Sequence, residues 1–120
     1  MLHAYALGAV LQMAADGDER APGAAVTAAL CGSWEHEGPC PVAPHRSVAL
    51  RHGDTVELRI VYACPPGAEQ AVRSTIGAAL SSAHLEHPVG RTTTWQVSSC
   101  SQEDLLPAER PFADRLTGLP

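Results

Sequence analysis

Two runs of alternating residues, separated only by Gly53-Asp54, place the strongest constraint on how this chain folds. Side chains that alternate with a period of two lie on opposite faces of a strand. Glycine at the first of two central turn positions suits the type II′ turn that joins antiparallel strands. Residues 47–52 and 55–64 are therefore expected to form a hairpin with one buried and one solvated face. In the longer strand, one face carries Val56, Leu58, Ile60 and Tyr62, and the other carries Glu57, Arg59, Val61 and Ala63.

A helix is expected after this hairpin, at about 67–83, because apolar residues then recur at helical spacing. These residues are Val72, Ile76, Ala79, Leu80 and Ala83. A Pro-Val-Gly break at 88–90 follows, and the β-branched and aromatic run 91–98 predicts another strand. Its inward residues are expected to be Thr93, Trp95 and Val97. A strand–helix–strand connection of this kind predicts that 55–64 and 91–98 run parallel.

The N-terminal third of the chain is harder to interpret. Residues 3–14 fit either a strand or a helix, and the large/small alternation along them favours the strand. Residues 24–31 are expected to form a second strand, with Val26, Ala28 and Leu30 on one face. The stretch 32–46 contains three prolines, which exclude regular pairing or a helix.

The resulting order of elements is β-β-β-β-α-β, or α-β-β-β-α-β if the N-terminal segment is helical. It predicts an α+β fold, an antiparallel-rich sheet of four or five strands with one main helix (67–83) on one face. The opening of that helix, Pro65–Glu69, is similar to that of many ferredoxin-like α+β domains. A two-layer sandwich of the ferredoxin-like type would accommodate this order.

The length of 120 residues suits one domain. We expect a single α+β domain over 1–100, followed by an irregular or weakly helical tail over 101–120. Two prolines limit any helix in that tail to short pieces. Phe112 and Leu116 form an i, i+4 pair there that could dock on the domain or on a partner.

Composition excludes several classes of protein. The net charge is −5 and the basic residues, all arginine, are scattered, so no basic stripe for nucleic acid exists. No apolar run is long enough to span a membrane. Residues 2–15 have the hydrophobicity of a signal peptide but no basic residue precedes them, since the first is Arg20. A cytoplasmic location, with reduced thiols, is therefore expected. The absence of Lys and Asn indicates a GC-rich, bacterial genome.

One loop concentrates residues that can carry chemistry. Cys31, His36, Cys40 and His45 supply the thiolate and imidazole ligands of a Cys2His2 set, although their spacing is not that of a zinc finger. They predict a metal site, with zinc as the candidate ion. A binding role is assigned to the neighbouring Trp34, Glu35 and Glu37. Two alternatives remain: a plain connection shaped by its prolines, and a thiol enzyme in which His36 or His45 activates Cys40.

The other cysteines are interpreted from their strands. The expected topology brings Cys31, Cys40, Cys64 and Cys100 to one end of the sheet. Cys64 is in phase with the buried face of its strand, so it is expected in the core, whereas Cys31 and Cys100 are out of phase unless a bulge intervenes. A Cys64–Cys100 disulfide is a lesser alternative. His84 and His87 are interpreted as residues that cap the preceding helix.

No nucleotide-binding glycine loop and no serine-hydrolase elbow is present in the sequence. We therefore expect a small soluble binding or assembly module that acts as a homodimer, because an open sheet with one good helix leaves a face or an edge uncovered. The alternative is a metal-binding protein or small enzyme built on the loop from Cys31 to His45.

Overall fold

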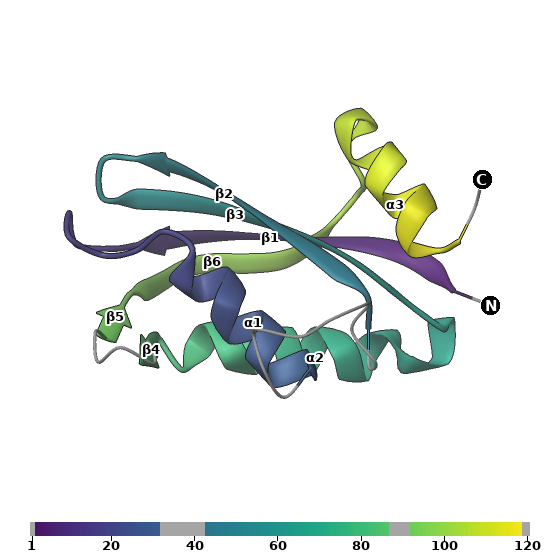
Figure 1. Cartoon of the computed structure of the whole chain (residues 1–120), viewed down its shortest axis with the longest axis horizontal. Coiled ribbons are helices and arrows are strands. Elements are labelled where there is room, and N and C mark those ends of the chain that lie inside the picture. The colour runs from purple at the N-terminus through teal and green to yellow at the C-terminus, as the bar shows by residue number, and fades with distance from the viewer. Residues whose placement is uncertain (1, 32–42, 87–91, 119–120) are drawn as a thin grey trace.

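The chain folds into a four-stranded antiparallel sheet with helices on both faces (Figure 1). The computed structural model describes residues 2–31, 43–86 and 92–118. The main sheet and its helices are formed by β1 (His3–Gln12), α1 (Ala21–Cys31), β2 (His45–His52), β3 (Thr55–Cys64), α2 (Glu69–Ser81), β6 (Gln96–Glu103) and α3 (Arg110–Leu116). Two short strands, β4 (His84–Glu86) and β5 (Thr92–Thr94), pair with each other, and the 3-10 turns η1 (Pro66–Ala68) and η2 (Pro107–Glu109) precede α2 and α3.

The strand order in the main sheet is β2-β3-β1-β6. Both β3 and β6 are antiparallel to the central β1, so they run parallel to each other, as the strand–helix–strand connection predicts. The order β1-α1-β2-β3-α2-β6 is the β-α-β-β-α-β arrangement of the ferredoxin-like motif. The predicted α+β class, with an antiparallel-rich sheet and its helices in a second layer, is therefore confirmed.

The predicted hairpin is present as β2 and β3. Its two-residue turn joins His52 to Thr55, and Gly53 has a φ of 62°, the left-handed region that glycine adopts without strain. Val56, Leu58, Ile60 and Tyr62 are all buried, as the alternation predicts. In β2, however, the more apolar face is the solvated one, where Val48 is 50% and Leu50 56% exposed.

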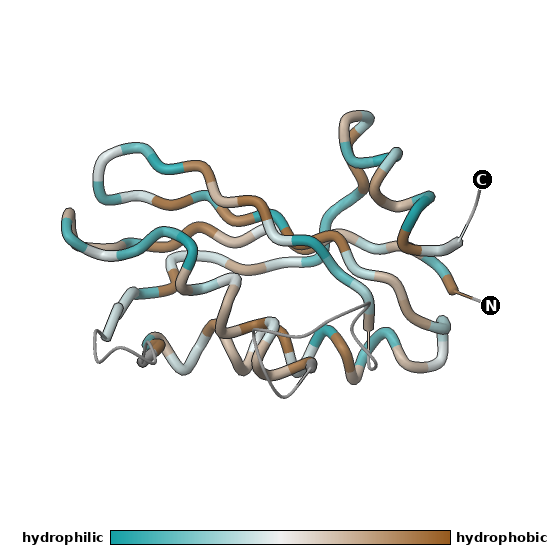
Figure 2. The backbone as a smooth tube through the Cα atoms, viewed as in Figure 1, coloured by the Kyte–Doolittle hydropathy of each residue, from teal (hydrophilic) through white to brown (hydrophobic). Residues whose placement is uncertain are grey.

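The inner face of the sheet and the helices α1 and α2 enclose the core. Of the segment 3–14, residues 3–12 form strand β1, as favoured, and Leu7, Ala9 and Leu11 point toward the helices. From α2, Val72, Ile76 and Leu80 pack against them. In Figure 2 hydrophobic residues recur along the strands and along the helices that face them. The predicted helix at 67–83 is thus confirmed as η1 followed by α2.

The strand predicted at 24–31 is wrong: this segment belongs to helix α1. Its buried residues Pro22, Val26 and Leu30 are spaced by four, which is a helical stripe. Val26 and Leu30 also fit a period of two, so alternation over eight residues could not distinguish the two structures. Proline at the second helical position and a run of alanines favour the helix.

The last strand is interrupted and bulged. Trp95, which separates β5 from β6, is 3% exposed and faces inward as predicted. A bulge in β6, opposite Val10 and Leu11, returns Cys100 to the same face as Val97. Cys100 was expected on the opposite face from Val97 unless a bulge intervened, and this bulge is the exception that applies. The strand β6 also runs on to Glu103 rather than ending at 98.

Candidate functional site

The predicted metal loop falls mostly outside the described residues. His36, Cys40, Trp34, Glu35 and Glu37 all lie there, so their roles stay predictions. Of the four predicted ligands, Cys31 is the last residue of α1 and His45 is the first residue of β2. Within the described ranges, no three His, Cys, Asp or Glu side chains are arranged to hold a metal ion.

His45 is held at both ring nitrogens. Its Nδ1 lies 2.9 Å from the carbonyl oxygen of Ala43, which can only accept, so Nδ1 donates. In the neutral ring, the other nitrogen, Nε2, then accepts a hydrogen bond of 2.8 Å from the hydroxyl of Thr27 on α1. A ring nitrogen that donates to a backbone carbonyl is a common support for a metal-bound histidine. Here Nε2 could bind a metal only if the Thr27 hydroxyl gave up its hydrogen bond.

We predict about one zinc ion per chain if this loop is a metal site. Protein purified without a histidine tag or added metal should then contain zinc by elemental analysis, and Cys40→Ala should lose it. His84→Ala is the matched control because His84 donates to the carbonyl of Ser82 at the end of α2, far in sequence from the loop. Protein that contains less than about a tenth of a zinc per chain would exclude the site.

The two described cysteine side chains do not form a site. Cys64 is buried as predicted, and burial raises the pKa of its thiol, so it remains in the less nucleophilic protonated form. Cys64 pairs with His3 and Cys100 with Ala9, six positions apart along β1, which is about 20 Å. Both are free thiols, and neither the Cys64–Cys100 disulfide nor their clustering at one end of the sheet is correct.

The outer face of the sheet carries a charged cluster that sequence reasoning did not identify. Arg59, on β3, donates from Nε and Nη2 to the two carboxylate oxygens of Glu109, at 3.0 and 2.7 Å. It also donates to the carboxylate of Glu103, on β6, and to the carbonyl oxygen of Asp104. We call Arg59, Glu103 and Glu109 the clamp, because they join β3 and β6 to the segment that begins α3.

Gly8 makes room for the clamp. It lies on β1 between Arg59 and Ser101, and a Cβ at this position would overlap the carboxylate of Glu103. With no side chain at position 8, the carboxylate of Glu103 can lie over the central strand in its present position, which a Cβ there would force it to leave. Glu109 is shielded by its neighbours, its side chain being 12% exposed. The hydrogen bonds from Arg59 lower the pKa of Glu109, which outweighs the opposite effect of burial.

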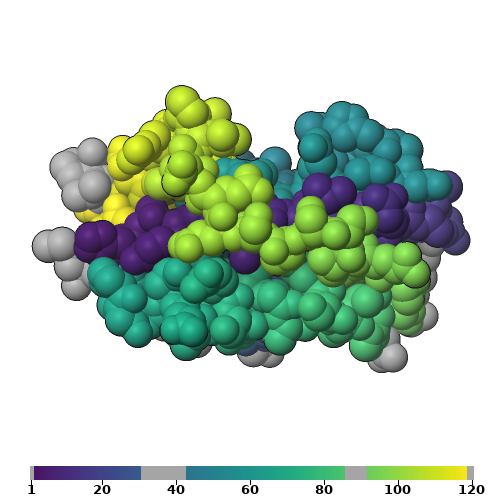
Figure 3. Space-filling view, turned by 180° about the vertical axis from the view of Figure 1, so that it is seen from behind, coloured from purple at the N-terminus to yellow at the C-terminus, as the bar shows by residue number. Residues whose placement is uncertain are grey.

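Helix α3 covers only part of the outer face. The helix packs there on β1 and β3 and buries Ala113, and the guanidinium of Arg46 lies 3.7 Å from the centre of the Phe112 ring. The predicted docking of the Phe112 region on the domain is thus present. The helix leaves uncovered the half of the outer face that is nearer to the β2–β3 turn, and Figure 3 shows a hollow between α3 and the hairpin.

We call this uncovered surface the open face. Register places its residues in rows across the strands, since Leu50 pairs with Glu57, Glu57 with Val10, and Val10 with Ser99. Val48 lies one row closer to α3. Two large apolar side chains at least half exposed on an edge strand are unusual for a surface that meets only water. The apolar side of β2 is a signal that the sequence does contain, since Val48 and Leu50 alternate there with Ser47, Ala49 and Arg51.

No family model, no curated protein and no solved structure matches this chain. None of the described helices has the length and hydrophobicity needed to cross a membrane.

Proposed function

We propose that the protein is a binding and assembly module that acts as a homodimer, in which the open face of one copy packs on the open face of another. The observation that carries this proposal is the exposure of Val48 and Leu50 beside the hollow left by α3. Burying two such side chains against apolar neighbours contributes roughly 1.5–3 kcal/mol for each residue fully buried.

The charges around this surface favour a second copy as the occupant. On the outer face of the hairpin, Arg46 lies at the end nearest α3, while Glu57 lies toward the turn, where it accepts from His52 at 3.1 Å. When the twofold axis runs across the strands, each surface meets itself with the strand direction reversed. The basic end of one copy would then face the acidic end of its partner, with the apolar residues at the centre.

Leu50→Glu is expected to convert the dimer to a monomer, because two carboxylates would be buried near the twofold axis. Sedimentation equilibrium should give about twice 12.6 kDa for the wild type and 12.6 kDa for the variant at micromolar concentration. The variant should keep its thermal stability as a monomer, since Leu50 is 56% exposed.

Leu106→Glu is the matched control, because Leu106 is 50% exposed, as Val48 is, but lies outside β2 and beside η2. It should leave the dimer intact. A wild type that sediments at 12.6 kDa would contradict the proposal, and so would a dimer that Leu106→Glu dissociates but Leu50→Glu does not.

A further inference from the structure

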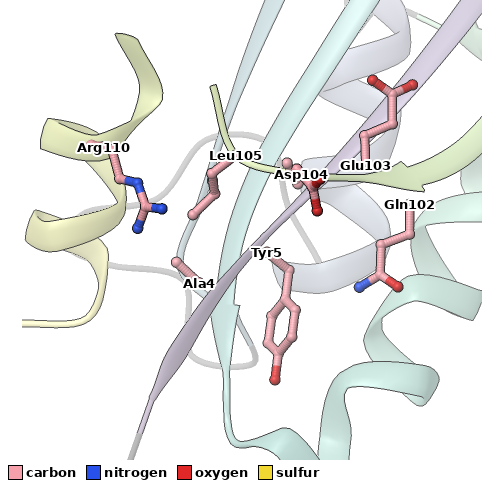
Figure 4. A pocket seen from close by; sticks show the side chains of 8 residues that line it. Ala4, Tyr5, Gln102, Glu103, Asp104, Leu105 and Arg110 are labelled. Atoms are coloured by element: carbon pink, nitrogen blue, oxygen red, sulfur yellow. The ribbon is translucent and has the colours of Figure 1, made fainter. Parts of the chain in front are cut away.

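A second surface lies where the edge strand β6 ends. A cavity of about 760 Å³ opens there between the first residues of β1, the end of β6 and the start of α3. Figure 4 shows Tyr5 on one side of it and Arg110 on the other, with Asp104 and Leu105 along the rim. The last residue of β6 to pair with β1 is Glu103, opposite Ala6.

On the side of this cavity, no strand among the described residues pairs with β1 before Ala6. Ala63 of β3 donates its N–H to the carbonyl of Pro44, which directly precedes β2, so the backbone groups of Ala63 point toward β2. Because these directions alternate along a strand, the backbone groups of Tyr62 and Cys64 point toward β1. Their partners His3 and Tyr5 therefore bond to β3, and Ala4 between them directs its N–H and C=O to the opposite side. No described strand stands opposite Ala4 on that side, because β6 has ended.

The side chains around this open edge differ between the two faces of the sheet. On the inner face Tyr5 stacks on Tyr62, with ring centres 5.6 Å apart, and forms a flat apolar wall. On the outer face Arg110 extends from α3 toward Ala4 and Leu105 (Figure 4). No carboxylate among the described residues lies within ion-pair distance of Arg110. Arg59, by contrast, forms ion pairs with two carboxylates, those of Glu103 and Glu109.

We propose that this cavity binds an extended peptide segment, which adds to β1 as a short strand in line with β6. The N–H and C=O of Ala4 would supply backbone hydrogen bonds, as in other cases of strand addition. Side chains of paired residues point to the same side of a sheet, and that of Ala4 is on the outer face. The peptide residue opposite Ala4 would therefore also direct its side chain to the outer face. That residue is acidic, since its carboxylate would meet the guanidinium of Arg110.

The proposal can be tested with a fluorescein-labelled peptide of sequence TVEVT, capped at both ends, and a matched peptide TVKVT. Anisotropy should show that the wild type binds the glutamate peptide at least tenfold more tightly than the lysine peptide, and that Arg110→Glu reverses this preference. Hydrogen exchange measured by NMR should slow at the amide of Ala4 when the glutamate peptide is present.

Ala4→Pro separates binding from folding. Proline removes the N–H by which Ala4 faces the cavity, and the bonds that His3 and Tyr5 make to β3 remain. The variant should keep the circular dichroism spectrum of the wild type, and its affinity for the glutamate peptide should fall at least tenfold. Equal binding of both peptides, unchanged binding by Ala4→Pro, exchange protection confined to the edge of β2, or no binding at millimolar peptide would each overturn the proposal. Leu50→Glu should bind the glutamate peptide normally, so the dimer proposal can fail independently of this one.

Discussion

Trp95→Ala is expected to lower the free energy of unfolding by about 3–5 kcal/mol, which is a large part of the stability of a typical small domain. Trp95 is 3% exposed and fills the space between the sheet and the end of α2. The sequence contains only two Trp, two Tyr and one Phe. Few other large side chains could therefore move into the cavity that the substitution leaves. Urea denaturation followed by circular dichroism would measure the loss.

Trp95→Phe is the control for the polar part of this effect. The Nε1–H of Trp95 donates to the carbonyl oxygen of Leu80 at 2.9 Å, near the end of α2. That oxygen also accepts from the backbone N–H of Ala83, so losing the indole donor should cost only about 1 kcal/mol. If Trp95→Ala were no more destabilising than Trp95→Phe, packing at this position would not be what stabilises the fold.

Arg59→Met is expected to cost about 2–3 kcal/mol, because it leaves the shielded carboxylate of Glu109 without its charged partner. Glu109 also accepts from the backbone N–H of Leu106, so its side chain caps the turn η2 that leads into α3. We therefore expect the variant to lose protection from hydrogen exchange in α3 before the rest of the sheet. Glu103→Gln is the control, since Glu103 is 47% exposed and should cost less than about 1 kcal/mol.

The clamp also predicts a pH dependence. Because the pKa of Glu109 is lower in the folded protein than in the unfolded chain, its stabilising effect is complete above the unfolded pKa of 4.5. The effect is lost as the pH falls below 4.5 and through the folded pKa, where the carboxylate takes up a proton. The wild type should therefore lose more stability than Arg59→Met between pH 5 and pH 3. If the free energies of unfolding of the wild type and of Arg59→Met fell equally over that range, Glu109 would not be the source of this pH dependence.

Much of the fold was predictable because it follows from short-range patterns. The hairpin turn needs a residue of positive φ, and Gly53 supplies it between two alternating strands. Val72, Ile76 and Leu80 are joined by Ala79 and Ala83, and this combination of spacings fits a helix but not a period of two. Helix α1 was not predicted because the segment 24–31 is only eight residues long. Over that length, apolar residues spaced by four also fit the period of two that is typical of a strand.

The candidate sites were less predictable. The clamp joins positions 59, 103 and 109, which no local pattern connects, and the carboxylate of Glu103 lies where a Cβ at Gly8 would be. The loop with the cysteines and histidines was the evident signal in the sequence, yet His45 engages Thr27, a residue that no metal-ligand spacing would select. Ligand-forming residue types show where chemistry could occur, but only their positions in space decide whether they meet.

The sequence by itself determined the α+β class, the hairpin, the buried face of β3, and the burial of Cys64 and Trp95. These depend on periodicity and turn chemistry, which neighbouring residues specify. Only the tertiary structure decided the strand order, the bulge that reorients Cys100, the half of the outer face that α3 leaves open, and the gap beside Ala4. Each of these depends on where one element ends relative to another that is distant in the chain, and that relation has no local signature.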